Sequence, residues 1–484
     1  MSQKSPSAPA QRPLNIFLLA MINVAAICSL KNWPLNAMYG FSSLFFYLVA
    51  ALGFFIPSAL VSAELASGWP KNGGIYAWIK EAMGHKMGFL AIWMQWISNV
   101  VWYPTTLSFV AIVICQSFNP LLANSSLYTF IAILALYWGA TFVNFRGMKL
   151  SGWVSTCGVI VGTMIPGVFI ITLGILWLLS GKPIEITMSW KTFVPDLSSV
   201  SGISYLAGTI LGFSGIEMSA VHARDVVNPR RNYPKAILLS TLIILGLSVL
   251  GTLAVAIVIP HERINLLSGG IDALRYFFQA YHLEWMMPLL SLLIGFGSFS
   301  AVVTWIIGPS RGLLTAAQDG DLPPFLHKTN SYGMPTTMLI VQGFIVTVLS
   351  SIFLFIPDIS SSFWILIALA SILYNMMYIM MFVAAIMLKY QQPHTPRPYA
   401  IPGNKLGMWM IGGLGLLVAG FTFIIGFFPP SNITFSTTSY VLTLVLGTAL
   451  FATLPFLILI FKRSSWNIDK AKVTEGESTK ELTS

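Results

Sequence analysis

Two ionisable residues stand inside long apolar runs of this 484-residue chain. Glu217 is the only carboxylate deep within such a run, because Glu64 lies close to the end of another. Lys31 stands in the second half of the first run, in the sequence SLKNWP. A charged group in hydrocarbon is costly, so such residues are usually functional, paired or protonated. These two side chains predict ion binding, gating or proton coupling rather than covalent catalysis.

Two of the runs are interrupted at corresponding places. The run that begins near Ser201 contains GTILGFSGIEMSA, in which three glycines precede Glu217. The first run contains MINVAAICSLKNWP, with the small residues Ala25 and Ala26 in its middle. An interrupted helix exposes backbone amides and carbonyls, which bind the charged end groups of a solute. For the first run, a simple kink at Pro34 is the alternative interpretation.

The signatures of several enzyme classes are missing from the sequence. It contains no Walker loop, no HExxH and no CxxC pair. The three cysteines lie in apolar runs and show neither metal-ligand nor paired spacing. We therefore expect no enzymatic activity, no metal site and no cofactor. Without an ATP-binding loop, the energy source of any transport is expected to be a solute gradient.

The elements that must position these residues are long apolar helices. Hydrophobic residues make up 56% of the chain and charged residues only 9%, against roughly a quarter in soluble domains. A helix that spans a bilayer needs about 20 apolar residues, because its backbone finds no water there. Twelve runs meet this demand, beginning near Leu14, Phe41, Lys86, Leu127, Ser151, Ser201, Pro234, Trp285, Pro335, Phe363, Leu406 and Ser439.

The charges predict how these spans are oriented. If the N-terminus is cytoplasmic, 21 of the 26 basic residues fall on cytoplasmic segments, which is the positive-inside pattern. We therefore expect a multi-pass protein of the inner membrane with cytoplasmic ends, 1–13 and 463–484. The net charge of +10 then reflects topology and contact with the lipid bilayer, and no nucleic-acid partner is expected.

The runs divide into two halves and an addition. Residues 14–180 and 201–389 each contain five runs, and 405–462 contain two more. Because five is odd, the second half must be inverted relative to the first, an arrangement in which interrupted helices meet near mid-membrane. The predicted fold class is an all-α integral membrane protein with 12 transmembrane helices, built as a 5+5 inverted repeat plus two C-terminal helices.

Three stretches carry a resemblance to a known family. They are AELASGWPKNGGIYAWIKEAMG, GFSGIEMSAVHARDVVNPRRNYPKA and WIIGPSRGLLTAAQDGDLPP, which span 63–84, 212–236 and 305–324. In these, and in the spacing of its spans, the chain resembles the amino acid/polyamine/organocation (APC) transporters, and within them the bacterial glutamate/4-aminobutyrate antiporter branch. The resemblance covers nearly the whole chain. It implies the LeuT-like fold and transport by alternating access.

The resemblance also implies where a substrate binds. In that family, backbone groups at the two helix breaks hold the carboxylate and amine of an amino acid. The matching positions here are Asn23, Ala25, Ala26 and Ile27 in the first run, and Phe213, Ser214 and Gly215 in the sixth.

Three further side chains correspond to functional positions of the family. Asn99 matches a polar position that lines the pocket in exchangers of basic amino acids, although an interhelical hydrogen bond is an alternative. Trp305 matches an aromatic gate between substrate and cytoplasm, although such rings also serve packing. Glu217 matches a glutamate implied in gating, proton sensing or coupling, and its alternative role is a structural anchor for the broken backbone.

Two positions depart from the glutamate-exchanging pattern. Lys31 stands where those relatives look to have a tyrosine, and Ala301 where their exchanger has a carboxylate. Lys31 either snorkels to the outer interface or faces the solute path. In the path it would neutralise Glu217 or offer a cation to an acidic substrate. The family's substrate therefore cannot be transferred unchanged to this chain.

We expect a secondary active antiporter. Its substrates would be a glutamate-like or neutral amino acid and a related amino acid or its decarboxylated amine. A homodimer is possible. The alternatives are a proton-coupled symporter, disfavoured because 151–180 contain no charged residue, and a solute sensor of the same fold, for which the short tail offers no signalling domain.

Overall fold

The computed structural model describes residues 15–71, 73–195, 203–204, 206–220, 228–260, 263–356, 358–430 and 436–466. Within these ranges all regular structure is helical and no strand occurs. The predicted N-terminal segment, 1–13, and most of the predicted tail lie outside them. The predicted all-α membrane class is confirmed over the described residues.

Ten continuous helical stretches are long and apolar enough to cross a bilayer. Several of them join shorter helices end to end, and three include a π-helical segment, η2, η4 or η7. The stretches are η1 (Gly40–Ser42) with α3 (Ser43–Ala50), η2 (Ala51–Phe55) and α4 (Ile56–Gly68); most of α6 (His85–Phe118); α7 (Ser126–Phe145); α8 (Met148–Cys157) with η4 (Gly158–Met164) and α9 (Ile165–Leu179); α14 (Pro229–Ala256) from Pro234 onward; η6 (Glu284–Met286) with α16 (Met287–Ala316) and η7 (Ala317–Asp321); α17 (Thr336–Ser350) with α18 (Ile352–Phe355); α19 (Ile359–Gln391); α20 (Asn404–Ile425); and α21 (Thr437–Ile460).

The two remaining predicted spans are the interrupted ones. The first consists of α1 (Ile16–Ile27) and α2 (Asn32–Ala37), and the other contains α12 (Leu206–Gly212) and α13 (Glu217–Ala220). The chain leaves α1 before Pro34, which lies in the first turn of α2, where its missing amide costs no helical hydrogen bond. The interpretation as a kink at Pro34 is therefore wrong. Since neither interrupted span is long enough by itself, the count of twelve stays a prediction.

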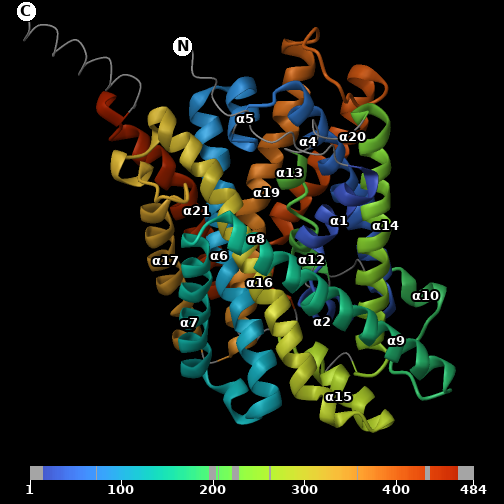
Figure 1. The fold of residues 1–484 in the computed structure, drawn as a ribbon. Coiled ribbons are helices and arrows are strands. Elements are labelled where there is room, and N and C mark those ends of the chain that lie inside the picture. The colour runs from blue at the N-terminus through green and yellow to red at the C-terminus, as the bar shows by residue number, and fades with distance from the viewer. Residues whose placement is uncertain are drawn as a thin grey trace, which may run out of the picture.

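The centre of the bundle is formed by α6 and α19, whose apolar stretches are each 89% buried inside the protein. Both lie in the middle of the ribbon, and α16 packs along α6 (Figure 1). Gly162 of η4 lies directly against Gly297 of α16, so a Cβ atom on either residue would overlap the other backbone. Small residues of this kind allow membrane helices to approach closely.

Within α16, residues 308–312 read GPSRG and match the GxSxG pattern of hydrolases. Here the serine lies inside a continuous helix rather than on a strand-to-helix turn, so it does not form a nucleophile elbow.

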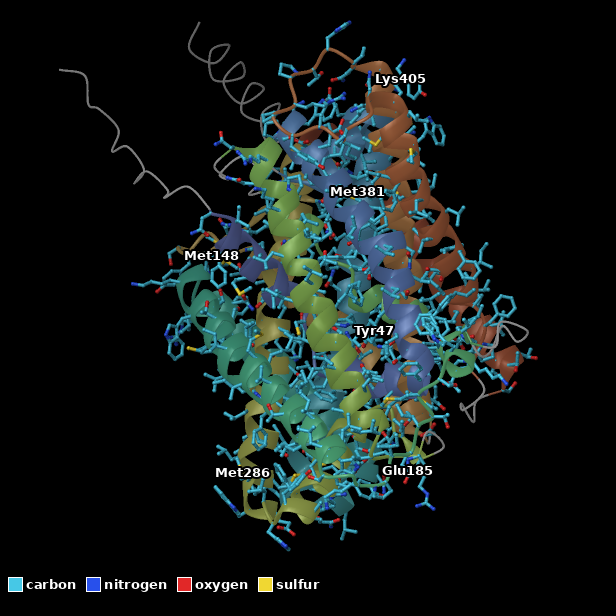
Figure 2. The ribbon with its side chains drawn as sticks, turned by 90° about the vertical axis from the view of Figure 1, so that its right-hand side faces the viewer. Tyr47, Met148, Glu185, Met286, Met381 and Lys405 are labelled. Atoms are coloured by element: carbon cyan, nitrogen blue, oxygen red, sulfur yellow. The ribbon has the colours of Figure 1, made fainter. Side chains whose placement is uncertain are left out.

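The bundle has two ends, which we name after the short helices found there. The α5 end contains α5 (Ile75–Met83) and Lys405, and the α15 end contains α15 (Gly269–Tyr281) and Met286 (Figures 1 and 2). Tyr47 lies between the two ends (Figure 2). The interruptions α1/α2 and α12/α13 also lie between them, with α13 on the side of the α5 end (Figure 1).

Candidate functional site

A cavity of about 60 Å³ lies between the two interrupted helices. One water molecule needs roughly 10 to 15 Å³ by the same measure, so the space exceeds that of a single water several times. Its walls come from both interruptions and from the central helices α6, α16 and α19. The lining residues are Ile27, Cys28, Ser29, Lys31, Asn32, Ser98, Asn99, Trp102, Gly208, Leu211, Gly212, Ser214, Ala301, Trp305, Ile367 and Tyr374.

The interruption of the sixth predicted span is shaped by Gly215. Its φ of 115° is a conformation that residues with a side chain rarely adopt. The Gly215 amide leaves the helical pattern and donates to the hydroxyl of Tyr378, at 2.7 Å. The indole of Trp305 lies so close that a Cβ atom on Gly215 would overlap it. The predicted gate residue is thus in contact with the predicted break, and it also lines the cavity.

Glu217 follows this interruption directly and is 2% exposed. Its carboxylate accepts hydrogen bonds from Gln95 at 2.8 Å, from Tyr374 at 2.6 Å and from Tyr378. It does not line the cavity itself, but Tyr374 does, so the carboxylate lies behind that ring. Three donors compensate for the loss of hydration that burial of a carboxylate entails.

Lys31 is 2% exposed and lines the cavity. Its Nζ donates to the hydroxyls of Thr106 at 2.9 Å and Thr105 at 3.2 Å. The interpretation in which Nζ snorkels to the outer interface does not fit this burial. Among the described residues no carboxylate oxygen lies within 4.0 Å of Nζ, so neutralisation of Glu217 by a direct ion pair is wrong as well.

The other predicted site residues divide into two groups. Ile27, Ser214 and Asn99 line the cavity, and the Asn99 amide also donates to the carbonyl of Gln95, at 2.8 Å. Phe213 lines an adjoining smaller cavity instead.

The residues predicted to form the first interruption, 23–27, lie within α1, and the interruption follows them at 28–31. Asn23 is not among the described residues that line the cavity. The Asn23 amide points toward α14, where it donates to Ser240 at 3.3 Å. Ala25 and Ala26 lie in α1, and their side chains are outside the described part of the structure.

Sequence reasoning missed the residues that surround these positions. On α6, Gln95 and Trp102 share a face with Asn99 at helical spacing, and this polar and aromatic periodicity was a usable signal. On α19, Tyr374 and Tyr378 are four residues apart and therefore also share a face. Nothing in the local sequence indicates that the two tyrosines meet Glu217.

Beyond the cavity, a cluster around the carboxylates of Asp319 and Asp321 lies at the α5 end. Asp321 is fully buried and accepts from Lys462 at 2.9 Å, from Tyr76 at 3.2 Å and from His85. Tyr76 donates to Asp319 as well, at 2.7 Å. Burial, together with the two carboxylates, raises the pKa of Tyr76 far above its usual range. The cluster thus joins α5, the start of α6, η7 and the end of α21.

A second set of contacts at this end is centred on Glu64 of α4. Its carboxylate forms ion pairs with Lys389 at 2.8 Å and Arg397 at 3.0 Å, and it accepts the amide of Ile401 at 2.8 Å. Glu64 is therefore engaged in a buried ion-pair network and does not reach the cavity.

Comparisons with known proteins agree with this arrangement. The chain is 45% identical over 424 residues to an uncharacterized transporter of Legionella pneumophila, covering 88% of this chain and 91% of that protein. It is 33% identical over 455 residues to a glutamate/gamma-aminobutyrate antiporter of Lactococcus lactis, covering 93% and 90%. In three dimensions it shares the fold of a manganese transporter of Eremococcus coleocola, with a TM-score of 0.56, 13% identity and coverage of 92% and 93%.

The first two relatives are transporters. The match to a protein family covers most of the chain. The sequence profile of amino acid permeases fits residues 14–451, which include both interrupted helices and every cavity residue. The predicted APC relationship is confirmed, and the chain belongs to the amino acid permease family.

Proposed function

We propose that this chain is a secondary active antiporter that exchanges an amino acid for a related amino acid or for its decarboxylated amine. The observation that carries the proposal is the cavity between two interrupted helices. Backbone groups inside a bilayer are left unpaired only where they line a cavity, and there they can bind a solute. The similarity to an antiporter over 93% of the chain supports the same mode of transport.

In this proposal the backbone binds the charged ends of the amino acid. Carbonyls at the C-terminal end of α1, near Ile27, favour an ammonium group, because a helix C-terminus carries partial negative charge. Amides at the interruptions favour a carboxylate. Ser214 and Asn99 line the same cavity and add neutral hydrogen-bonding groups. A zwitterionic end group thus meets complementary partners without a charged side chain.

The barrier toward the α5 end consists of Trp305 and the hydrogen-bonded group Glu217, Tyr374 and Tyr378. In alternating access this barrier opens while another closes at the α15 end. Glu217 ties α13 to α6 and α19, so its three hydrogen bonds must break or rearrange for the path to open. This gives Glu217 a role in gating and makes exchange sensitive to its protonation.

We further propose that the α5 end faces the cytoplasm and that residues 14–180 and 201–389 form the two inverted repeats. The distribution of basic residues in the sequence supports this orientation in the inner membrane. Inverted repeats place two interrupted helices opposite each other, in agreement with their adjacency around the cavity. A homodimer stays a prediction.

Exchange is tested with the purified protein in liposomes. Vesicles loaded with one unlabelled amino acid or amine are supplied with labelled amino acids and amines from outside. We expect uptake of at least one labelled solute to depend on the internal solute, with little uptake into empty vesicles.

The alternatives predict different results in the same assay. A proton-coupled symporter takes up solute into empty vesicles when a pH gradient is imposed. A sensor binds a solute without moving it. Equal uptake into loaded and empty vesicles would overturn the antiport proposal.

A further inference from the structure

Lys31 places an amino group against a cavity whose other described lining residues have neutral side chains. Among the described residues that line the cavity, it is the only one with a formally charged side chain. Its ammonium group is held by two neutral hydroxyls and lies 4.8 Å from the ring centre of Trp102 and 5.8 Å from that of Phe363. Hydroxyls and aromatic faces stabilise a cation, but they do not neutralise it.

The nearby carboxylate does not serve as its counter-ion. Glu217 is occupied by Gln95 and two tyrosines, and no ion pair of Lys31 occurs in the described part of the chain. Ala301 lines the same cavity and has no charge to offer. A buried cation without a charged partner is expensive, and the cavity next to it is the place from which a partner can come.

We propose that Lys31 binds a carboxylate at the far end of the substrate's side chain, so that the substrate is an amino acid with an anionic side chain. This inference rests on the proposed function and assigns its substrate class. An acidic amino acid carries a net charge of −1 near neutral pH, which balances the single positive charge of the lining. Thr105 and Thr106 fix the ammonium group at the edge of the cavity, so Lys31 is a specificity-determining residue.

The same contact suits the exchange partner. Decarboxylation of an acidic amino acid breaks the bond to the α-carboxylate, releases carbon dioxide and leaves a proton in its place. The side-chain carboxylate and the amine both remain. Substrate and product therefore keep the group that Lys31 binds, and the cavity accepts both. A diamine such as putrescine brings two positive charges to this lysine and is excluded.

The test compares solutes of equal shape and different charge. L-glutamate and L-glutamine are measured as competitors of counterflow in liposomes, with putrescine as the cationic probe. The wild-type protein should prefer L-glutamate over L-glutamine and should not accept putrescine. Lys31→Met keeps most of the length of the side chain and removes the amino group. It should reduce the preference for L-glutamate by roughly tenfold or more, the usual effect of one lost charged hydrogen bond.

Two controls separate charge from damage. Lys31→Arg retains the positive charge and should retain the preference. Lys191→Met removes an exposed lysine of α10 (Trp190–Phe193), away from the cavity, and should behave as wild type. If Lys31→Met cannot be purified, stabilisation of the wild-type protein against heat by L-glutamate, L-glutamine and putrescine decides the question, because only the first should stabilise it.

The outcomes are distinct. The role of Lys31 is overturned if the wild-type protein does not distinguish L-glutamate from L-glutamine, or if Lys31→Met shows the same preference as the wild type. Either result leaves antiport standing. Absence of exchange with every amino acid and amine overturns the proposed function and this inference together.

Discussion

At the scale of single residues, polar groups in the core of this protein are paired over long distances in sequence. Glu217 receives three hydrogen bonds from α6 and α19, and Lys31 donates two to α6. The two ionisable side chains singled out in the sequence therefore bind different partners and do not form an ion pair with each other. Glu217 belongs to the barrier and Lys31 to the wall of the cavity.

The first prediction concerns the charge of Glu217. Glu217→Gln keeps the size of the side chain but removes its titration, so the dependence of exchange on pH should flatten and the rate should fall. Counterflow at a series of pH values between about 5 and 8 measures this. Tyr374→Phe serves as the comparison, because it removes one hydrogen bond and leaves the carboxylate in place. A pH profile unchanged in a well-folded Glu217→Gln protein would exclude the gating role.

A second prediction concerns the backbone at Gly215. Alanine there is strained at φ 115° and its Cβ overlaps the Trp305 ring. Gly215→Ala should lower the stability of the protein by about 1 to 3 kcal/mol and reduce exchange. Thermal unfolding in detergent measures the first effect and counterflow the second. Gly139→Ala on α7 is the matched control, since nothing lies within 4 Å of its Cβ position. Wild-type behaviour of Gly215→Ala would contradict the described interruption.

At the scale of elements, the interrupted helices and the polar face of α6 were accessible from sequence for physical reasons. Glycine, proline and charged residues disfavour a continuous apolar helix, so the existence of both interruptions and the position of the second were predictable. The position of the first was not: the predicted residues 23–27 belong to α1, and the interruption follows them at 28–31. The rotation of each helix about its axis was not predictable either, because it depends on packing between distant segments. Asn23 illustrates this, since it turns toward Ser240 on α14 instead of the cavity. The partners of Lys31 were hidden for the same reason.

A third prediction concerns α5, which Glu81 ties to its surroundings. Lys71 and Gln392 donate to this carboxylate at 2.8 and 2.9 Å, and these hydrogen bonds lower the pKa of Glu81 below its ordinary value of 4.5. A lowered folded-state pKa stabilises the protein above pH 4.5, and this contribution is lost as the pH falls through the folded value.

Glu81→Gln should therefore be less stable than wild type near pH 7, by less than about 1 kcal/mol because the pair is partly exposed to solvent. The difference should shrink in acid and in high salt. Thermal unfolding of both proteins at several pH values measures it. A difference that stays constant down to the most acidic pH would show that shape, and not charge, stabilises this contact.

At the scale of the whole molecule, the protein combines buried ion-pair contacts at its α5 end with a cavity in its middle. Asp321 and Glu64 connect helices from the beginning, middle and end of the chain through buried ion pairs and hydrogen bonds. Breaking one partner of such a buried network is strongly destabilising, typically by about 3 to 5 kcal/mol. These two sets of contacts tie helices together at the α5 end, so in the proposed exchange access from that end would require their rearrangement.

The central claim is that the substrate occupies the cavity between the two interrupted helices. Ala301→Trp tests it most directly, because Ala301 lines the cavity and an indole in its place would occupy space that the substrate needs. Leu292→Trp, at a 45% exposed position of the same helix, is the control for adding a tryptophan to α16. Both proteins are checked for folding by thermal unfolding and then assayed for counterflow. We predict that Ala301→Trp loses at least tenfold of the counterflow rate while Leu292→Trp retains it; wild-type counterflow by a folded Ala301→Trp protein would contradict the location of the site.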